Sequence, residues 1–149
     1  MSIKQAVKAL QITAMKAKDK ETLATARMIT SAIGNAEIDA RTKNKELTDS
    51  DIMATLRSMI KSRQDSIALY EKAGATDRVQ AEQNEINVIK MFLPESLSRD
   101  EMIAIISPIA EKIKAGEMKS GPAMGFIKKA GGDRIDMGEA KKILDELTA

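Results

Sequence analysis

Apolar residues recur every three or four positions along most of this sequence, which is the spacing of an amphipathic helix. The clearest case lies between residues 49 and 73, where Ile52, Leu56, Ile60 and Ile67 share one stripe of a helical wheel. Aromatic residues are scarce, with one Tyr, two Phe and no Trp, whereas Met occurs ten times. Because Ala, Lys, Glu and Met favour helices over strands, we predict an all-α protein.

Start and stop signals divide the periodic pattern into seven segments. Side chains that can cap a helix N-terminus precede several of these segments, namely Asp19, Thr48 with Asp51, Thr76, Ser98 with Glu101, and Asp136 with Glu139. Gly74 is placed to end the third helix. The pattern therefore predicts helices over residues 2–18, 20–40, 49–73, 77–92, 99–115, 122–130 and 137–147.

The best boundary in the chain is the stretch LPESLSRDE at residues 93–101. Pro94 cannot continue a helix, and the next helix starts only at the capping signal of Ser98. We predict a multihelical fold with two subdomains, a four-helix part over residues 1–93 and a smaller three-helix part over residues 94–149. Pro108 lies inside the fifth predicted helix and is expected to kink or split it.

The sequence contains no Cys and no His. This composition excludes disulfides and any zinc site built from thiolate or imidazole ligands. It also excludes Cys or His as a catalytic nucleophile or general base. The chemistry left to the chain is that of carboxylates, Lys, Tyr and Ser, and no spacing of Glu residues singles out a metal site.

The formal net charge is +2, which permits an anionic partner without requiring one. The first twenty residues are amphipathic, with Lys every few positions and no continuous apolar run. We interpret them as a first helix, and not as a signal peptide or a membrane span. The default expectation is a cytoplasmic protein.

An arginine lies in the middle of the apolar stripe of residues 52–70. The short turn at Gly74 makes the next helix an antiparallel neighbour, so Arg63 should lie opposite Glu85, with Glu82 about one turn away. We favour an ion pair that fixes the register of the two helices, since an unpaired buried charge is costly. Two alternatives remain open: a guanidinium that reaches water, or one presented to a ligand phosphate.

Gly34 stands in the interior of the second predicted helix, where glycine costs about 0.5–1 kcal/mol relative to alanine. The favoured explanation is tight packing against another helix, and the alternative is close approach of a ligand.

Four segments resemble the GatB/YqeY family in order along nearly the whole chain: RMITSAIGNAEI (27–38), IKSRQDSIALYEKAG (60–74), EQNEINVIKMFLPESLS (82–98) and GDRIDMGEAKKIL (132–144). The resemblance implies an all-helical fold with two subdomains. The same module forms the tail of the B subunit of the tRNA-dependent glutamyl/aspartyl amidotransferase and is fused to some glutaminyl-tRNA synthetases. In both settings it is regarded as contacting tRNA.

Stand-alone members of that family are labelled carbon–nitrogen ligases with glutamine as amido-N-donor. The common glutaminases need a Cys nucleophile, which this chain lacks. Activating a carboxyl with a nucleotide would need a phosphate-binding site, and no glycine-rich phosphate loop is present. We therefore expect no cofactor, no metal and no catalytic residue, with tRNA or a tRNA-modifying or tRNA-charging enzyme as the partner. The oligomeric state is left open.

Binding to RNA would rest on Lys and Arg contacts with phosphates. The candidates are Arg27, Arg41, Lys43, Lys45, Lys61, Lys119, Lys128, Lys129 and Arg134. Each of them taken singly is more simply explained as part of a solvated face. The aromatic residues are scattered, so sequence-specific reading of single strands is not expected. The alternative function is a protein–protein adaptor without an RNA role, in which the methionines serve as adaptable interface residues.

Overall fold

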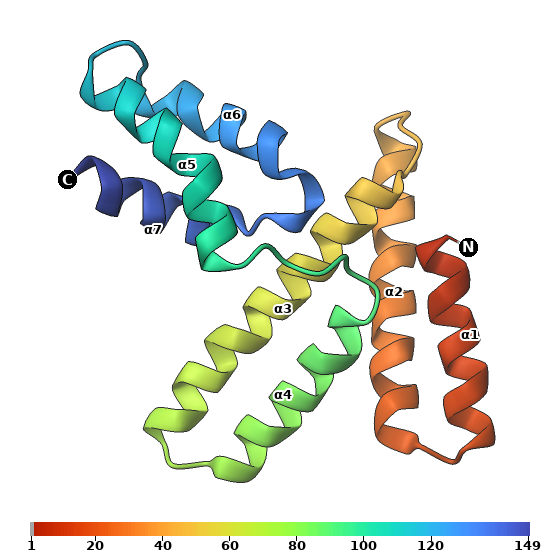
Figure 1. Ribbon diagram of the computed structural model, residues 1–149. Coiled ribbons are helices and arrows are strands. Elements are labelled where there is room, and N and C mark those ends of the chain that lie inside the picture. The colour runs from red at the N-terminus through yellow and green to blue at the C-terminus, as the bar shows by residue number, and fades with distance from the viewer. Residues whose placement is uncertain (1) are drawn as a thin grey trace. The chain divides into compact units, whose positions relative to one another are not determined.

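The computed structural model describes residues 2–149, and within that range all regular secondary structure is helical (Figure 1), which confirms the all-α prediction. The elements in chain order are α1 (Ile3–Lys16), α2 (Lys20–Thr42), α3 (Asp49–Lys72), α4 (Thr76–Lys90), α5 (Arg99–Lys114), α6 (Ser120–Gly131), the short 3₁₀ helix η1 (Gly132–Arg134) and α7 (Met137–Thr148). Among the described residues, none of these helices is long and apolar enough to cross a membrane.

The chain divides into two compact units, of which the first ends at Leu93 and the second begins at Pro94. Helices α1–α4 belong to the first unit, and α5–α7 with η1 belong to the second.

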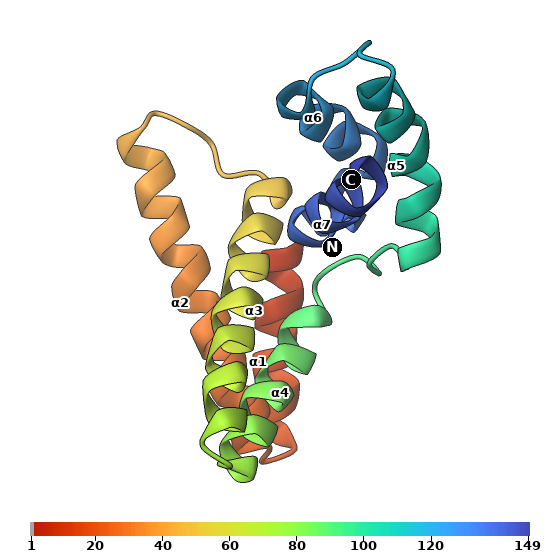
Figure 2. The ribbon, with the colours of Figure 1, turned by 90° about the vertical axis from the view of Figure 1, so that its left-hand side faces the viewer.

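The first unit is built from two helical hairpins, α1–α2 and α3–α4 (Figures 1 and 2). Gly74 adopts φ +68° after α3, a left-handed conformation that suits glycine and lets the chain reverse into α4. Helix α2 packs on both α3 and α4, so it joins the two hairpins. The core where they meet consists of Val7, Ile29, Ile33, Ile52, Leu56, Ile60, Ile86 and Ile89.

Side-chain caps explain most helix starts. Thr48 forms a reciprocal capping box with Asp51, and Ser98 forms one with Glu101. Asp19 and Asp136 accept hydrogen bonds from backbone N–H groups at the starts of α2 and α7. These four N-caps agree with the sequence prediction.

The predicted cap at Thr76 is wrong. Helix α4 is preceded by Ala75, which has no side-chain cap, and Thr76 is already its first residue. The backbone N–H of Thr76 donates to the Gly74 carbonyl at 3.0 Å. The tight turn around Gly74 therefore brings the chain into the helix one residue earlier than the capping pattern indicates.

The second unit packs α5 against α6 and α7 around one core. The buried side chains are Met102, Ile106, Ala110, Ala123, Ile127, Ile135, Ala140, Ile143 and Leu144. The segment that enters α5 is tied to η1, because the Leu97 N–H donates to the Arg134 carbonyl at 2.9 Å and Arg134 Nε donates to the Glu95 carbonyl at 3.0 Å.

Helix α5 runs without interruption through Pro108, so of the two expected effects of proline, a kink or a split, the split does not occur. Proline removes the backbone N–H that would bond the Ala104 carbonyl. Both Ala104 and Pro108 lie on the exposed side of α5, where water can satisfy that carbonyl. The helix can therefore continue along its buried side, which carries Ile106 and Ala110.

Candidate nucleic-acid interface

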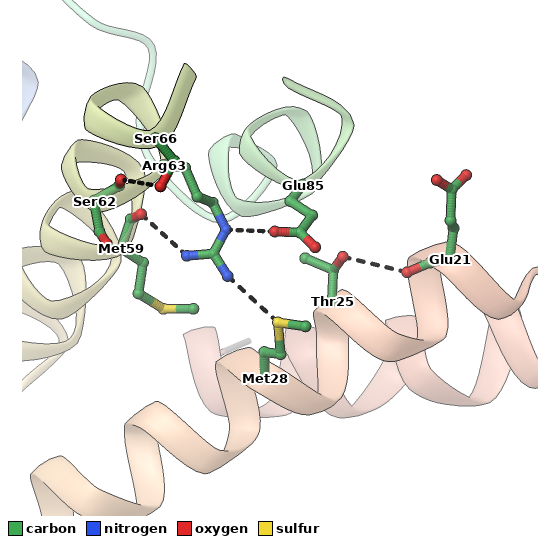
Figure 3. A network of polar contacts seen from close by, with 8 residues as sticks. All are labelled: Glu21, Thr25, Met28, Met59, Ser62, Arg63, Ser66 and Glu85. Carbon is green, nitrogen blue, oxygen red and sulfur yellow. Dashed lines mark hydrogen bonds and ion pairs between the residues drawn. The ribbon is translucent and has the colours of Figure 1, made fainter. Parts of the chain in front are cut away.

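Arg63 of α3 is held by three neighbours (Figure 3). Its Nε donates to Glu85 Oε2 of α4 at 2.8 Å, and one terminal nitrogen donates to the Met59 carbonyl at 3.1 Å. The other terminal nitrogen lies 3.3 Å from the sulfur of Met28 on α2. The side chains of Arg63 and Glu85 are only 15% and 29% exposed. The ion pair thus links α3 to α4 at a half-buried point, with α2 beside it.

Glu82, the second carboxylate predicted to take part in this ion pair, does not pair with Arg63. Among the described residues Arg63 forms an ion pair with Glu85 alone. Glu82 lies nearly one helical turn from Glu85, and the Nε–Glu85 bond fixes the direction of the guanidinium. Arg63 therefore does not bridge two carboxylates.

An open hollow of about 550 Å³ lies on α3 beside Arg63. It is lined by Ala54, Thr55, Ser58, Met59, Ser62 and Arg63. The Thr55 hydroxyl already donates to the Asp51 carbonyl within its own helix. Because Arg63 is turned toward Glu85, Met59 and Met28, the hollow has no free, converging set of charged groups.

The candidate cations of the first unit are all exposed, but they differ in their neighbours. Lys43 pairs with Asp39 at 3.1 Å, and Lys61 lies 3.9 Å from Asp65. No acidic side chain in the described part of the chain forms an ion pair with the remaining three, Arg27, Arg41 and Lys45. Hydrogen bonds from Thr48 lower the pKa of Asp51 most, and the charge of Lys45 acts on that carboxyl in the same direction. The first unit therefore offers two candidate cations, Arg27 and Arg41, that have no acidic partner among the described residues.

The candidates of the second unit separate in the same way. Arg134 lies 3.8 Å from Glu101 and binds the Glu95 carbonyl, so it helps hold the entry to α5. Lys119 is the residue before α6, and Lys128 and Lys129 lie in its last turn. These three lysines are exposed and form no ion pair with any described residue. No Asp or Glu occurs between Met118 and Gly132.

Gly34 does not pack tightly against another helix, contrary to the favoured expectation. A Cβ atom built at this position would have no other heavy atom within 4 Å. Gly34 does lie in the interior of helix α2, as predicted, but the explanation that it allows tight packing against another helix is wrong.

One exposed side chain that the sequence analysis did not single out is Phe126 of α6, which is 54% exposed. A helical wheel could not have identified it, because Phe126 lies about 100° from buried Ile127 but only about 60° from buried Ala123.

The titration of two carboxyl groups is explained by helix capping. The hydroxyl and then the backbone N–H of Thr22 lower the pKa of Asp19 below its usual 3.8. The backbone N–H and then the hydroxyl of Thr48 lower the pKa of Asp51 in the same direction. Within residues 2–149, no group of three or more Asp or Glu side chains is arranged to hold a metal ion.

The fold defines a class of protein: a small all-helical protein whose described residues form two compact units. Comparison with known proteins identifies the family within that class. The sequence matches the family described as Yqey-like protein over residues 3–147, and the chain belongs to that family.

Several curated relatives are fungal. The chain is 36% identical over 107 residues to "Altered inheritance of mitochondria protein 41, mitochondrial" of Kluyveromyces lactis, which covers 70% of this chain and 56% of that protein. It is 37% identical over 103 residues to the protein of the same name in Komagataella phaffii, covering 63% and 53%. An uncharacterized protein of Schizosaccharomyces pombe is 30% identical over 84 residues, covering 56% and 66%. The chain spans little more than half the length of the first two relatives.

The expectation of a cytoplasmic protein is contradicted by these relatives. The proteins of Kluyveromyces lactis, Komagataella phaffii and Pyrenophora tritici-repentis that match this chain are all named as mitochondrial.

Proposed function

We propose that this chain is an RNA-binding accessory module that acts on tRNA or on a tRNA-charging or tRNA-modifying enzyme bound to tRNA. The observation that carries the proposal is the surface of α6. Three exposed lysines, Lys119, Lys128 and Lys129, stand there with no acidic residue between Met118 and Gly132. Exposed lysines are side chains that bind phosphates and release the counterions condensed on a nucleic acid.

The resemblance to the GatB/YqeY family supports tRNA as the RNA, since the related module forms the tail of the tRNA-dependent amidotransferase. The residues favour binding over catalysis. The chain has no Cys for glutamine hydrolysis, and its half-buried polar cluster around Arg63 is satisfied within the first unit. The ligase label of stand-alone relatives then describes the enzyme that carries the tail.

The test is a titration of tRNA with the purified chain at several salt concentrations. Each phosphate contact contributes about 0.7–0.9 to the slope of log K against log salt. Replacing Lys119, Lys128 and Lys129 with Gln should lower the magnitude of that slope by about 2 and weaken binding. The matched control replaces Lys112, Lys141 and Lys142, which are exposed lysines on α5 and α7, and changes the net charge equally.

Two results would contradict the proposal. The first is no tRNA binding at low salt. The second is an equal loss of affinity in the two triple variants, which would show that net charge and not the α6 surface drives association.

The second candidate function is a protein–protein adaptor, and one observation favours it. Helices α1 and α2 carry four exposed large apolar side chains, Ile12, Met15, Met28 and Ile38, at 54%, 57%, 43% and 58% exposure. If the chain is an adaptor, changing Ile12 and Ile38 to Ser should abolish complex formation with its protein partner and leave tRNA affinity unchanged.

A further inference from the structure

The aromatic side chain of α6 has no place in the core of its unit. Phe126 is the only Phe, Tyr or Trp between Pro94 and Ala149, and it is 54% exposed. Ala123 and Ile127, which lie about 60° and 100° around the helix from Phe126, are fully buried. The unit therefore folds around aliphatic side chains and leaves its one aromatic ring to solvent.

One cation lies beside the ring and a second lies farther along the helix. Side chains three and four positions apart share a helix face, so Phe126 is flanked by Pro122 on one side and by Lys129 on the other. Lys119 lies about two turns away from Phe126, just before the helix begins. Neither lysine forms an ion pair with any residue in the described part of the chain.

The surface beside the ring is also unobstructed. Gly121 and Gly125 are exposed, and a Cβ at either position would meet no atom within 4 Å. No neighbouring side chain at these two positions shields the outer face of α6.

A ligand that suits this surface must be anionic and must also offer a flat, polarizable face. Unpaired nucleotides of RNA have both properties, because every base has a π-face and every linkage carries a phosphate. An anionic membrane meets the charge requirement, but binding to it needs several apolar side chains on one face. Phe126 is the only exposed large apolar side chain among the described residues of the second unit.

We infer that an unpaired RNA base stacks on Phe126 while Lys119 and Lys129 contact the phosphates on either side of it. This inference rests on the proposed RNA-binding function and specifies the part of the RNA that the second unit contacts. Stacking on a single ring is tolerant of base identity. It therefore agrees with the expectation that the chain does not read a single-stranded sequence.

The test compares three variants, Phe126→Ala, Phe126→Leu and Phe126→Tyr, in binding to a short single-stranded RNA that carries 2-aminopurine and to the duplex of the same sequence. Removing one stacked base typically costs 5- to 150-fold in affinity, about 1–3 kcal/mol by alanine substitution. Phe126→Ala and Phe126→Leu should both lose about this much on the single strand and lose the quenching of 2-aminopurine. Phe126→Tyr should keep both the affinity for the single strand and the quenching of 2-aminopurine. The affinity for the duplex should be unchanged in all three variants.

The outcomes separate the inference from the proposed function. If the α6 lysine variant loses RNA affinity while Phe126→Ala does not, the function stands and the stacking inference is wrong. If the unmodified chain binds no RNA, both are wrong. Equal binding by Phe126→Leu and the unmodified chain would indicate an apolar contact and overturn stacking.

Two further measurements complete the test. The first measures binding to anionic vesicles of phosphatidylglycerol. If Phe126→Ala loses vesicle binding but keeps the RNA affinity of the unmodified chain, the surface binds lipid and the stacking inference is wrong. All three variants should keep the thermal midpoint of unfolding, and a lowered midpoint in all three would show that the ring is packed, which also overturns the inference.

Discussion

The ion pair between Arg63 and Glu85 should stabilise the first unit, and its removal is the sharpest test of the fold. In Arg63→Leu the Glu85 carboxylate, which is 29% exposed, loses the Nε–H donor 2.8 Å away. Hydrogen bonds to charged groups contribute about 1.5–3 kcal/mol, and breaking a fully buried pair costs about 3–5 kcal/mol. Because this pair is half-buried, we expect a loss of about 2–3 kcal/mol.

The chain offers its own probe for this measurement. Tyr70 is the only tyrosine, there is no Trp, and Tyr70 lies on α3 within the first unit. Its fluorescence during urea unfolding therefore reports on that unit alone. Arg63→Leu, Glu85→Leu and the double variant form a cycle, from which we expect a coupling energy of about 1–2 kcal/mol.

An exposed ion pair serves as the matched control. Lys43 and Asp39 are 62% and 66% exposed, so Lys43→Leu should cost less than about 1 kcal/mol. The reasoning is refuted if Arg63→Leu is no more destabilising than this control. If Arg63→Leu also abolished tRNA binding at full stability, Arg63 would be a ligand-binding residue and not a link between helices.

Three further predictions concern glycines and a cap. Gly34→Ala should raise the stability of the chain by about 0.5–1 kcal/mol in a thermal or urea melt, because the added Cβ meets no atom within 4 Å and the helix loses a flexible residue. Gly131→Ala should lower stability by about 1–3 kcal/mol, since its Cβ would lie 2.6 Å from the Cβ of buried Ile135; an unchanged melting temperature would contradict this. The pKa of Asp51 is lowered in the folded chain, so its stabilisation is present above the usual pKa of 3.8 and is lost as the pH falls through the folded value. Asp51→Asn should therefore be less stable than the unmodified chain at pH 6, and the difference should shrink toward pH 2.

Helix starts were predictable from the sequence where the capping interaction is local. Thr48 with Asp51 and Ser98 with Glu101 need only residues three positions apart, so the pattern contains the whole interaction. Thr76 failed because the turn at Gly74, with its positive φ, brought the chain into α4 one residue early. A helix boundary that depends on a backbone turn is therefore harder to predict from the sequence than one that depends on a side-chain cap.

Burial was less predictable, because it depends on which helices pack together. Counting from the turn at Gly74 already placed Arg63 opposite Glu85 with Glu82 about one turn away, but it could not show that the guanidinium would pair with Glu85 alone. For Gly34 the wheel could not show whether a neighbour was close, and the structure has none within 4 Å. Tertiary packing decided both questions.

Arg63 and Phe126 are both exceptions to the rule that charges lie outside and aromatic rings inside, and they lead to opposite conclusions. The charge of Arg63 is compensated within the chain by Glu85, so the exception is explained by the fold itself. Phe126 is 54% exposed, and neither Lys129 beside it nor Lys119 two turns away forms an ion pair among the described residues. An exception that the fold satisfies internally indicates a structural role. An exception that the fold leaves unsatisfied is a candidate for a ligand contact, and for this reason our proposal assigns the RNA contact to α6 and not to Arg63.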